Sequence, residues 1–212
     1  MIISNDLKCL FIGNPKTGTT TARSVLQPYG YYIADSHSTS PSPHLTVDEC
    51  FELLAAQKPE FNPSQLEHIY VFWRDPIKRF TSAYNHVRRS TAGNGMQILL
   101  KFRPDIFINN NTEISAENLL LNRINTPIKK YEDPIGQMLL PQSKWIKLNS
   151  ITTVLNFDDF ENNLKIVAAA FGADVSTLTI PALNESPDTG LVITSTLDAM
   201  IREYYAEDFT LI

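Results

Sequence analysis

The stretch Leu7–Thr20, LKCLFIGNPKTGTT, constrains the fold of this chain more than any other. Its first half predicts a strand, Leu7–Ile12, which ends at Gly-Asn-Pro. A polar loop follows and leads into an apolar pattern with helical spacing. Such a junction directs backbone N–H groups and the positive end of the helix dipole at one spot. We therefore expect an anion, most of all a phosphate, to bind at this loop.

The loop also carries its own donors. Lys16 adds a positive charge, Gly18 is expected to let the backbone approach a ligand closely, and the threonine hydroxyls add hydrogen bonds. From Gly13 to Thr20 the spacing is close to the nucleoside-triphosphate loop G-x-x-x-x-G-K-[ST]. Thr19 stands where that loop has the lysine that contacts the β- and γ-phosphates in a kinase, so this is a poor kinase loop. An ordinary strand-to-helix turn is the alternative.

A second polar segment follows the predicted strand His68–Trp73. Arg74-Asp75-Pro76 leads from that strand into a predicted helix over Pro76–Arg89, whose polar face carries Lys78, Arg79, Arg88 and Arg89. A solvated helix face accounts for Arg88 and Arg89. Arg74 is different, because it stands at the carboxyl end of a strand, where α/β sheets bind ligands, and we therefore expect Arg74 and the Lys16 loop to lie together in one crevice. The net charge of −5 means that this basic cluster is local.

Strands and helices alternate along the chain. The predicted strands are Leu7–Ile12, Tyr31–Ile33, His68–Trp73 and Thr152–Phe157, with helices between them. This order predicts an α/β fold with a mostly parallel sheet of about four to five strands flanked by helices, P-loop-like in character. We expect one domain over 1–212, with an irregular lid or substrate segment around 91–148.

Two histidines are candidates for a general base. His44 directly precedes a predicted helix, Thr46–Gln57, which starts with a capping box of Thr46 and Glu49. A residue held next to a capped helix start is well positioned, although an exposed loop histidine is the alternative. His37, in the Ser/Pro-rich loop before it, is the reserve candidate.

Composition excludes several classes of protein. Cys9 and Cys50 are the only cysteines and are expected to be small core residues, with no disulfide framework and no zinc cluster. No apolar stretch is long enough to span a bilayer, and no signal or anchor is recognised before the loop. We expect a soluble, cytoplasmic protein that binds neither nucleic acid nor a metal, and we leave its oligomeric state open.

Two motifs together resemble those of the sulfotransferases that use 3′-phosphoadenosine 5′-phosphosulfate (PAPS). Pro15-Lys16-Thr17-Gly18-Thr19-Thr20 resembles their 5′-phosphosulfate loop. Arg74-Asp75-Pro76…Arg79-Phe80…Ser82…Tyr84 resembles their 3′-phosphate motif, R-D-P-x-x-R-x-x-S-x-Y. The pattern is most similar to carbohydrate sulfotransferases of the Golgi type, without their anchor. Weaker similarity continues through Pro141-Gln142 and Asn156-Phe157-Asp158.

The resemblance implies transfer of a sulfuryl group from PAPS to a hydroxyl acceptor, a carbohydrate or a small molecule. It implies that His44 acts as the base and that Lys16 takes part in catalysis. A small P-loop-type nucleotide or metabolite kinase and a non-catalytic nucleotide-binding module remain the alternatives. The residues implied in binding PAPS are Pro15, Lys16, Thr17, Gly18, Thr19, Thr20, Arg74 and Ser82.

Overall fold

The structure is a computed structural model that describes residues 1–33, 44–90, 107–108, 113–126, 134–181 and 190–212. The chain divides into two compact units, each built from separate stretches of sequence. The first unit combines Met1–Arg74, Gln142–Glu185 and Leu211–Ile212, and it holds a five-stranded sheet. The second combines Asp75–Pro141 and Ser186–Thr210. The single-domain organisation of the 212 residues stays a prediction.

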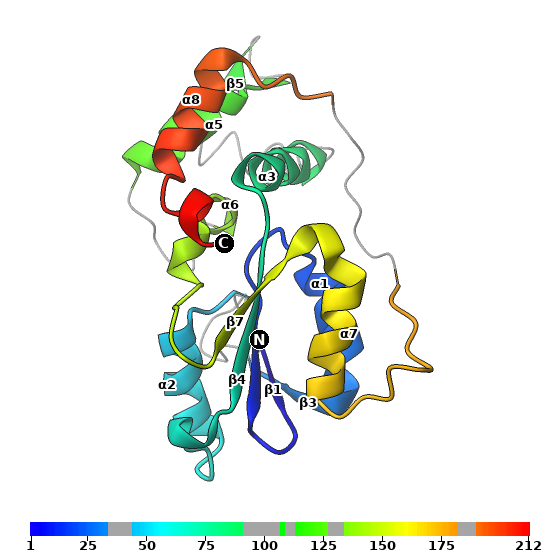
Figure 1. Ribbon diagram of the computed structural model, residues 1–212. Coiled ribbons are helices and arrows are strands. Elements are labelled where there is room, and N and C mark those ends of the chain that lie inside the picture. The colour runs from blue at the N-terminus through cyan, green and yellow to red at the C-terminus, as the bar shows by residue number, and fades with distance from the viewer. Residues whose placement is uncertain (34–43, 91–106, 109–112, 127–133, 182–189) are drawn as a thin grey trace. The chain divides into compact units, whose positions relative to one another are not determined.

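The first unit is an α/β structure around a mixed sheet (Figure 1). The spatial order of its strands is β3-β1-β2-β4-β7. Pairing is antiparallel on both sides of β1 and parallel between β2, β4 and β7. Strands β2, β3, β4 and β7 therefore share one direction, and β1 runs against them. The strands are β1 (Ile2–Ser4), β2 (Cys9–Ile12), β3 (Gly30–Tyr32), β4 (His68–Trp73) and β7 (Thr152–Asn156).

The α/β class and the strand number are confirmed, but the sheet is mixed and not mostly parallel, because of β1, a strand that was not predicted. It forms a hairpin with β2, in which Ile2 pairs with Phe11, and it separates β2 from β3. Its three residues, Ile2–Ser4, are all buried. Three residues are too few for a period of apolar positions to be recognised in a sequence.

The parallel register brings three strand ends to one edge of the sheet. Ile12 of β2 pairs with Val71 of β4, and Trp73 of β4 pairs with Asn156 of β7. The segments that follow β2, β4 and β7 therefore leave the sheet at its carboxyl edge. This is the edge at which α/β proteins bind ligands.

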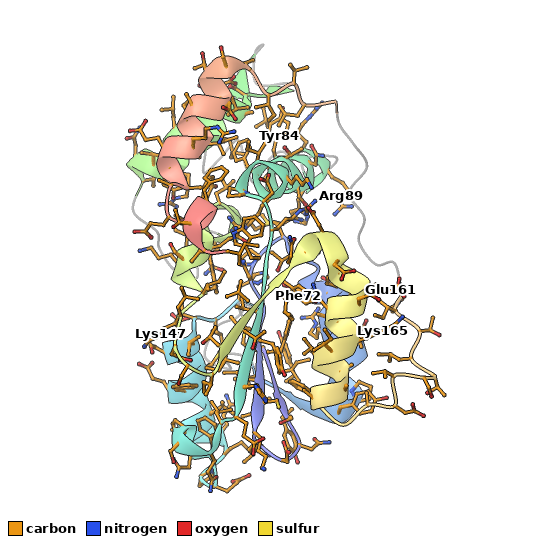
Figure 2. The ribbon with its side chains drawn as sticks, viewed as in Figure 1. Phe72, Tyr84, Arg89, Lys147, Glu161 and Lys165 are labelled. Carbon is orange, nitrogen blue, oxygen red and sulfur yellow. The ribbon has the colours of Figure 1, made fainter. Side chains whose placement is uncertain are left out.

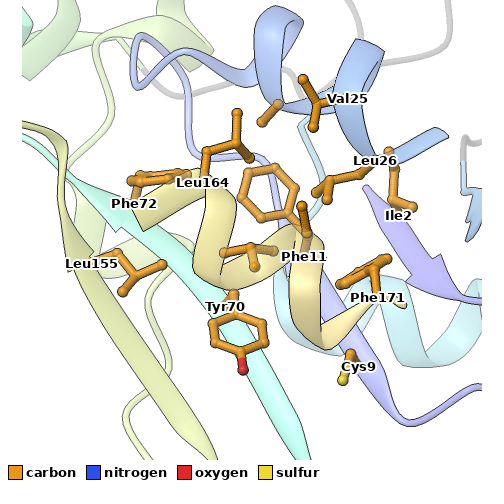
Figure 3. Packing of buried hydrophobic residues seen from close by; sticks show 13 residues of the cluster. Ile2, Cys9, Phe11, Val25, Leu26, Tyr70, Phe72, Leu155, Leu164 and Phe171 are labelled. Atoms are coloured by element: carbon orange, nitrogen blue, oxygen red, sulfur yellow. The ribbon is translucent and has the colours of Figure 1, made fainter. Parts of the chain in front are cut away.

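Helices cover both faces of the sheet. Helices α1 (Thr19–Leu26) and α7 (Phe160–Ala170) lie on one face, and α2 (Val47–Gln57) lies on the other (Figure 1). The core under α1 and α7 draws on the strands and on both helices (Figure 3). Its buried residues are Ile2, Cys9, Phe11, Ala22, Val25, Leu26, Tyr70, Phe72, Leu155, Leu164, Val167, Ala168 and Phe171.

Local sequence signals set the limits of these helices. The Thr46 side chain accepts from the backbone of Glu49, and the Glu49 carboxylate accepts from the backbone of Thr46, so the predicted capping box is confirmed. On α7, Lys165 and Glu161 form an ion pair one turn apart (Figure 2). The two cysteines are small buried residues, as expected. Burial raises the pKa of Cys9 to about 11 and that of Cys50 to about 12.

The second unit is mainly helical. Within 91–148 the structure describes residues 107–108, 113–126 and 134–148, which include two helices and a short pair of strands, and the role of the segment as a lid or substrate segment stays a prediction. The Tyr84 hydroxyl, in the helix Pro76–Ser90, donates to the Ile114 carbonyl oxygen, in the strand Glu113–Ile114, at 2.9 Å. The elements are α3 (Pro76–Ser90), β5 (Phe107–Ile108), β6 (Glu113–Ile114), α5 (Ala116–Asn125), α6 (Pro134–Met138) and α8 (Ser195–Tyr204).

Arg79 is buried, although the sequence pattern predicted that it would lie on the polar face of α3. Its guanidinium is buried and donates to the carbonyl oxygens of Met138 at 3.2 Å and Leu140 at 2.8 Å. Burial lowers its pKa, and the buried Tyr205 and Asp208 oppose that shift. Arg79 is therefore a core residue of the second unit.

Among the described residues, no helix has the length and apolar character needed to cross a membrane.

Candidate anion-binding site

The loop after β2 has a tightly specified backbone. Lys16 and Gly18 both have positive φ, 67° and 71°, and helix α1 begins at the next residue, Thr19. Asn14, Pro15 and Thr17 are buried, whereas Lys16 is half-buried. Proline has no N–H, so Pro15 contributes shape to this loop and no hydrogen-bond donor.

The threonine hydroxyls point inward. Thr17 and Thr19 both donate to the carbonyl oxygen of Asn14, each at 2.8 Å. The sequence predicted that threonine hydroxyls would bond to the ligand, but these two hydroxyl hydrogens are already used within the loop. Thr17 and Thr19 thus maintain the shape of the loop, and their backbone amides are the groups that remain for an anion.

Gly18 is required for a reason that the sequence did not suggest. A Cβ atom built at Gly18 would lie 2.6 Å from a ring carbon of Phe160 and 3.0 Å from one of Phe157. The loop backbone therefore packs directly on two aromatic rings. Together with the positive φ of Gly18, this contact excludes any side chain at the position.

The start of α1 has donors that the helix does not use. The first intrahelical bond runs from the amide of Ala22 to the carbonyl oxygen of Gly18. The amides of Thr19 and Thr20 precede it, and no acceptor for them is found in the part of the chain that the structure describes. These amides and the helix dipole favour negative charge at this point.

Arg74 reaches this loop from the end of the neighbouring strand. Its Nη1 donates to the carbonyl oxygen of Lys16 at 3.1 Å. Its guanidinium carbon also lies 4.7 Å from the centre of the Phe157 ring, within the range of a cation–π interaction. The prediction that the Lys16 loop and Arg74 lie together at the carboxyl edge is confirmed.

Gln142 connects these two segments. Its side-chain oxygen accepts from the backbone N–H of Arg74 at 3.0 Å and from Nδ2 of Asn14 at 2.9 Å. Its Nε2 donates to the carbonyl oxygen of Arg74 at 2.8 Å. The residue is fully buried. Sequence reasoning gave Gln142 no role, although the Pro141-Gln142 pair was part of the weaker resemblance.

Asn14 is the other end of this connection. Its Nδ2 also donates to the carbonyl oxygen of Phe72 at 3.0 Å, so its amide bonds both to β4 and to Gln142. Because both of these partners are acceptors, the orientation of the amide group is fixed. The loop is thereby attached to the neighbouring strand at its base.

His44 also lies at this edge. Its Nδ1 is 2.6 Å from the carbonyl oxygen of Gly13, at the start of the loop. A carbonyl only accepts, so Nδ1 carries the hydrogen and Nε2 is the basic nitrogen of the neutral ring. The role of His44 as the general base stays a prediction. His37, the reserve candidate, lies outside the described residues.

Ser82 is the one predicted PAPS-binding residue outside this group. It is half-buried on α3, in the second unit, and its role stays a prediction. The rest of the predicted set follows β2 and β4 in the first unit.

Among the described residues, no group of three or more His, Cys, Asp or Glu side chains could hold a metal ion.

The assembled groups are donors and cations. A lysine, an arginine and the amides at a helix start belong to the segments that follow two adjacent strands, and a histidine contacts the first of these segments. The cations and amides favour an anion with more than one charged group. The imidazole of the histidine can exchange a proton with a ligand bound nearby. Comparison of the chain with protein-family models, with curated proteins and with solved structures gives no match.

Proposed function

We propose that this protein is a sulfotransferase that moves a sulfuryl group from PAPS to a hydroxyl acceptor, with a carbohydrate as the acceptor class. The proposal has two supports of different kinds. One is the resemblance of the Pro15–Thr20 and Arg74–Tyr84 motifs to those of PAPS-dependent enzymes. The other is the contact of Arg74 with Lys16, which brings two cationic segments together after adjacent parallel strands.

In this reaction the bond between sulfur and the phosphate oxygen breaks, and a bond from the acceptor oxygen to sulfur forms. Adenosine 3′,5′-bisphosphate leaves, and the acceptor proton passes to Nε2 of His44. Lys16 and the amides of Thr19 and Thr20 stabilise the charge that grows on the leaving phosphate. Arg74 binds the 3′-phosphate, for which the resemblance also implies Ser82.

A kinase on a P-loop-like fold is the second candidate. The loop itself resembles a nucleoside-triphosphate loop in spacing, and a strand and a helix flank it in the expected order. Thr19 occupies the position of the kinase lysine, and its hydroxyl is bonded to the Asn14 carbonyl oxygen. A kinase would also require magnesium, which gives a simple experimental distinction. A non-catalytic nucleotide-binding module would bind the nucleotide without transferring a group.

The direct test is transfer from labelled PAPS to a panel of glycans and small alcohols, with and without a chelator. We expect labelled product that the chelator does not abolish. Lys16→Ala should lower the transfer rate by about 10²-fold, because one preorganised donor to a developing anion has roughly that effect.

Lys8→Ala is the matched control for Lys16→Ala. Lys8 precedes the same strand at its amino end, is exposed and pairs with Glu67. Its loss should leave transfer unchanged, because an exposed ion pair contributes little to stability. Phosphoryl transfer from ATP that requires magnesium would instead support the kinase. Binding of nucleotide without transfer to any acceptor would support the module.

Arg74→Ala is expected to weaken adenosine 3′,5′-bisphosphate by about tenfold or more and to affect adenosine 5′-monophosphate much less. A charge-assisted hydrogen bond contributes about 1.5–3 kcal/mol to binding. Adenosine 5′-monophosphate has no 3′-phosphate and so makes no such bond with Arg74. Isothermal titration calorimetry with both nucleotides measures the difference. Arg202→Ala, an exposed arginine of α8 paired with Asp198, is the control. Equal losses for the two nucleotides would contradict the assignment of Arg74.

A further inference from the structure

Phe157 is an aromatic residue at the third strand end of the carboxyl edge. It follows β7 directly, just as Arg74 follows β4. Trp73 and Asn156 are paired across these strands, so Arg74 and Phe157 are the next residues in the same register. The sheet itself thus brings the arginine and the ring side by side, and the guanidinium lies over the ring at 4.7 Å.

The same ring also contacts the loop. It would lie 3.0 Å from a Cβ atom at Gly18, which is closer than side-chain atoms normally approach. Phe157 therefore touches both segments from which the candidate site is built. Its backbone is fixed as well, because the Asn156 side chain accepts from the N–H of Asp158 at the start of a short 3₁₀ helix.

We propose that Phe157 is a positioning residue that orients the Arg74 guanidinium and thereby sets the preference of the site for a 3′-phosphate. This inference rests on the proposed function. Arginine has a long side chain with many rotamers, and its planar group binds a phosphate well only from a defined direction. A ring under the guanidinium restricts those rotamers before the ligand arrives.

A neighbouring ring provides a matched control. Phe160 belongs to the same aromatic cluster, with its centroid 5.1 Å from that of Phe157 and 4.9 Å from that of Phe72. It also packs against Gly18. Phe160 thus packs against the same cluster and the same glycine as Phe157, whereas the guanidinium of Arg74 lies over the Phe157 ring. A purely structural effect should appear in variants of both rings.

The test measures binding of adenosine 3′,5′-bisphosphate and adenosine 5′-monophosphate by calorimetry. Phe157→Leu should weaken the bisphosphate about 3- to 10-fold, the range expected from a partly desolvated cation–π contact, and leave the monophosphate within about twofold. Phe157→Tyr should restore the preference. Phe160→Leu should lower the thermal midpoint without changing the ratio of the two affinities. Phe157→Met, which keeps the apolar volume without the ring, replaces Phe157→Leu if that variant does not fold.

A double variant separates positioning from general damage. In the Arg74→Ala background, Phe157→Leu should weaken the bisphosphate no further, because the ring acts through the arginine. Losses that add, or equal weakening of both nucleotides by Phe157→Leu, would overturn the inference. If the wild-type protein prefers the bisphosphate and the Phe157→Leu variant shows the same preference, the inference is wrong but the proposed function is not contradicted. A wild-type protein without that preference would overturn both.

Discussion

His44→Ala is expected to lower kcat by at least about 10²-fold and to leave the affinity for adenosine 3′,5′-bisphosphate nearly unchanged. Removal of a general base typically has an effect of about 10²–10⁴ on rate. The bond from Nδ1 to the Gly13 carbonyl oxygen fixes the ring, so Nε2 is the nitrogen that takes the proton. Turnover with labelled PAPS, alongside nucleotide calorimetry, measures the two quantities separately.

The pH–rate profile gives a second readout for His44. A histidine base must be neutral to accept a proton, so the wild-type rate should fall on the acidic side, and the variant should lose this limb. His68→Ala is the control, because His68 is exposed at the amino end of β4, the opposite edge of the sheet. If His44→Ala keeps a normal kcat while His37→Ala does not, the base is His37. If neither variant matters, the catalytic part of the proposal fails.

Gln142→Leu is expected to lower the free energy of unfolding of the protein by about 2–4 kcal/mol. The substitution leaves the N–H and carbonyl groups of Arg74 without their buried partner and removes one acceptor from Asn14. Buried polar groups that lose a partner cost about 1–3 kcal/mol each, and leucine returns part of this by apolar burial. For a chain of this size, the thermal midpoint should fall by roughly 5–15 °C.

Tryptophan fluorescence is a suitable probe of that change. The chain has two tryptophans, Trp73 and Trp145, and both belong to the first unit. Gln27→Leu makes the same exchange at an exposed position of the same unit and should change the midpoint little. A midpoint for Gln142→Leu as high as that for Gln27→Leu would show that the three bonds contribute little to stability.

The carboxyl edge of the sheet was predictable because its determinants are local. Each of the relevant strands is an apolar run that ends at a helix-breaking or polar residue, and each is followed by a helical pattern. Parallel strands separated by helices then bring their ends to one edge without further information. That is why the neighbourhood of Lys16 and Arg74 could be inferred before any contact was known.

The roles of individual side chains were less predictable because they depend on distant partners. In the sequence Arg79 falls on the polar face of a predicted helix. It is nevertheless buried, and carbonyl oxygens about sixty residues later accept its hydrogens. Gln142 bonds to Asn14, which is far away along the chain. Gly18 meets two rings from a segment beyond residue 150. The spacing of apolar residues along the sequence does not indicate such contacts between distant residues.

The inward bonds of the loop have a consequence for the kinetics of ligand capture. Two threonine hydroxyls, the Asn14 amide and the ring contact at Gly18 already hold the backbone in its final shape. Little of the loop is left to be ordered when an anion arrives. Association is then governed by the diffusional encounter of unlike charges, which dissolved salt slows by screening, rather than by a rearrangement of the polypeptide.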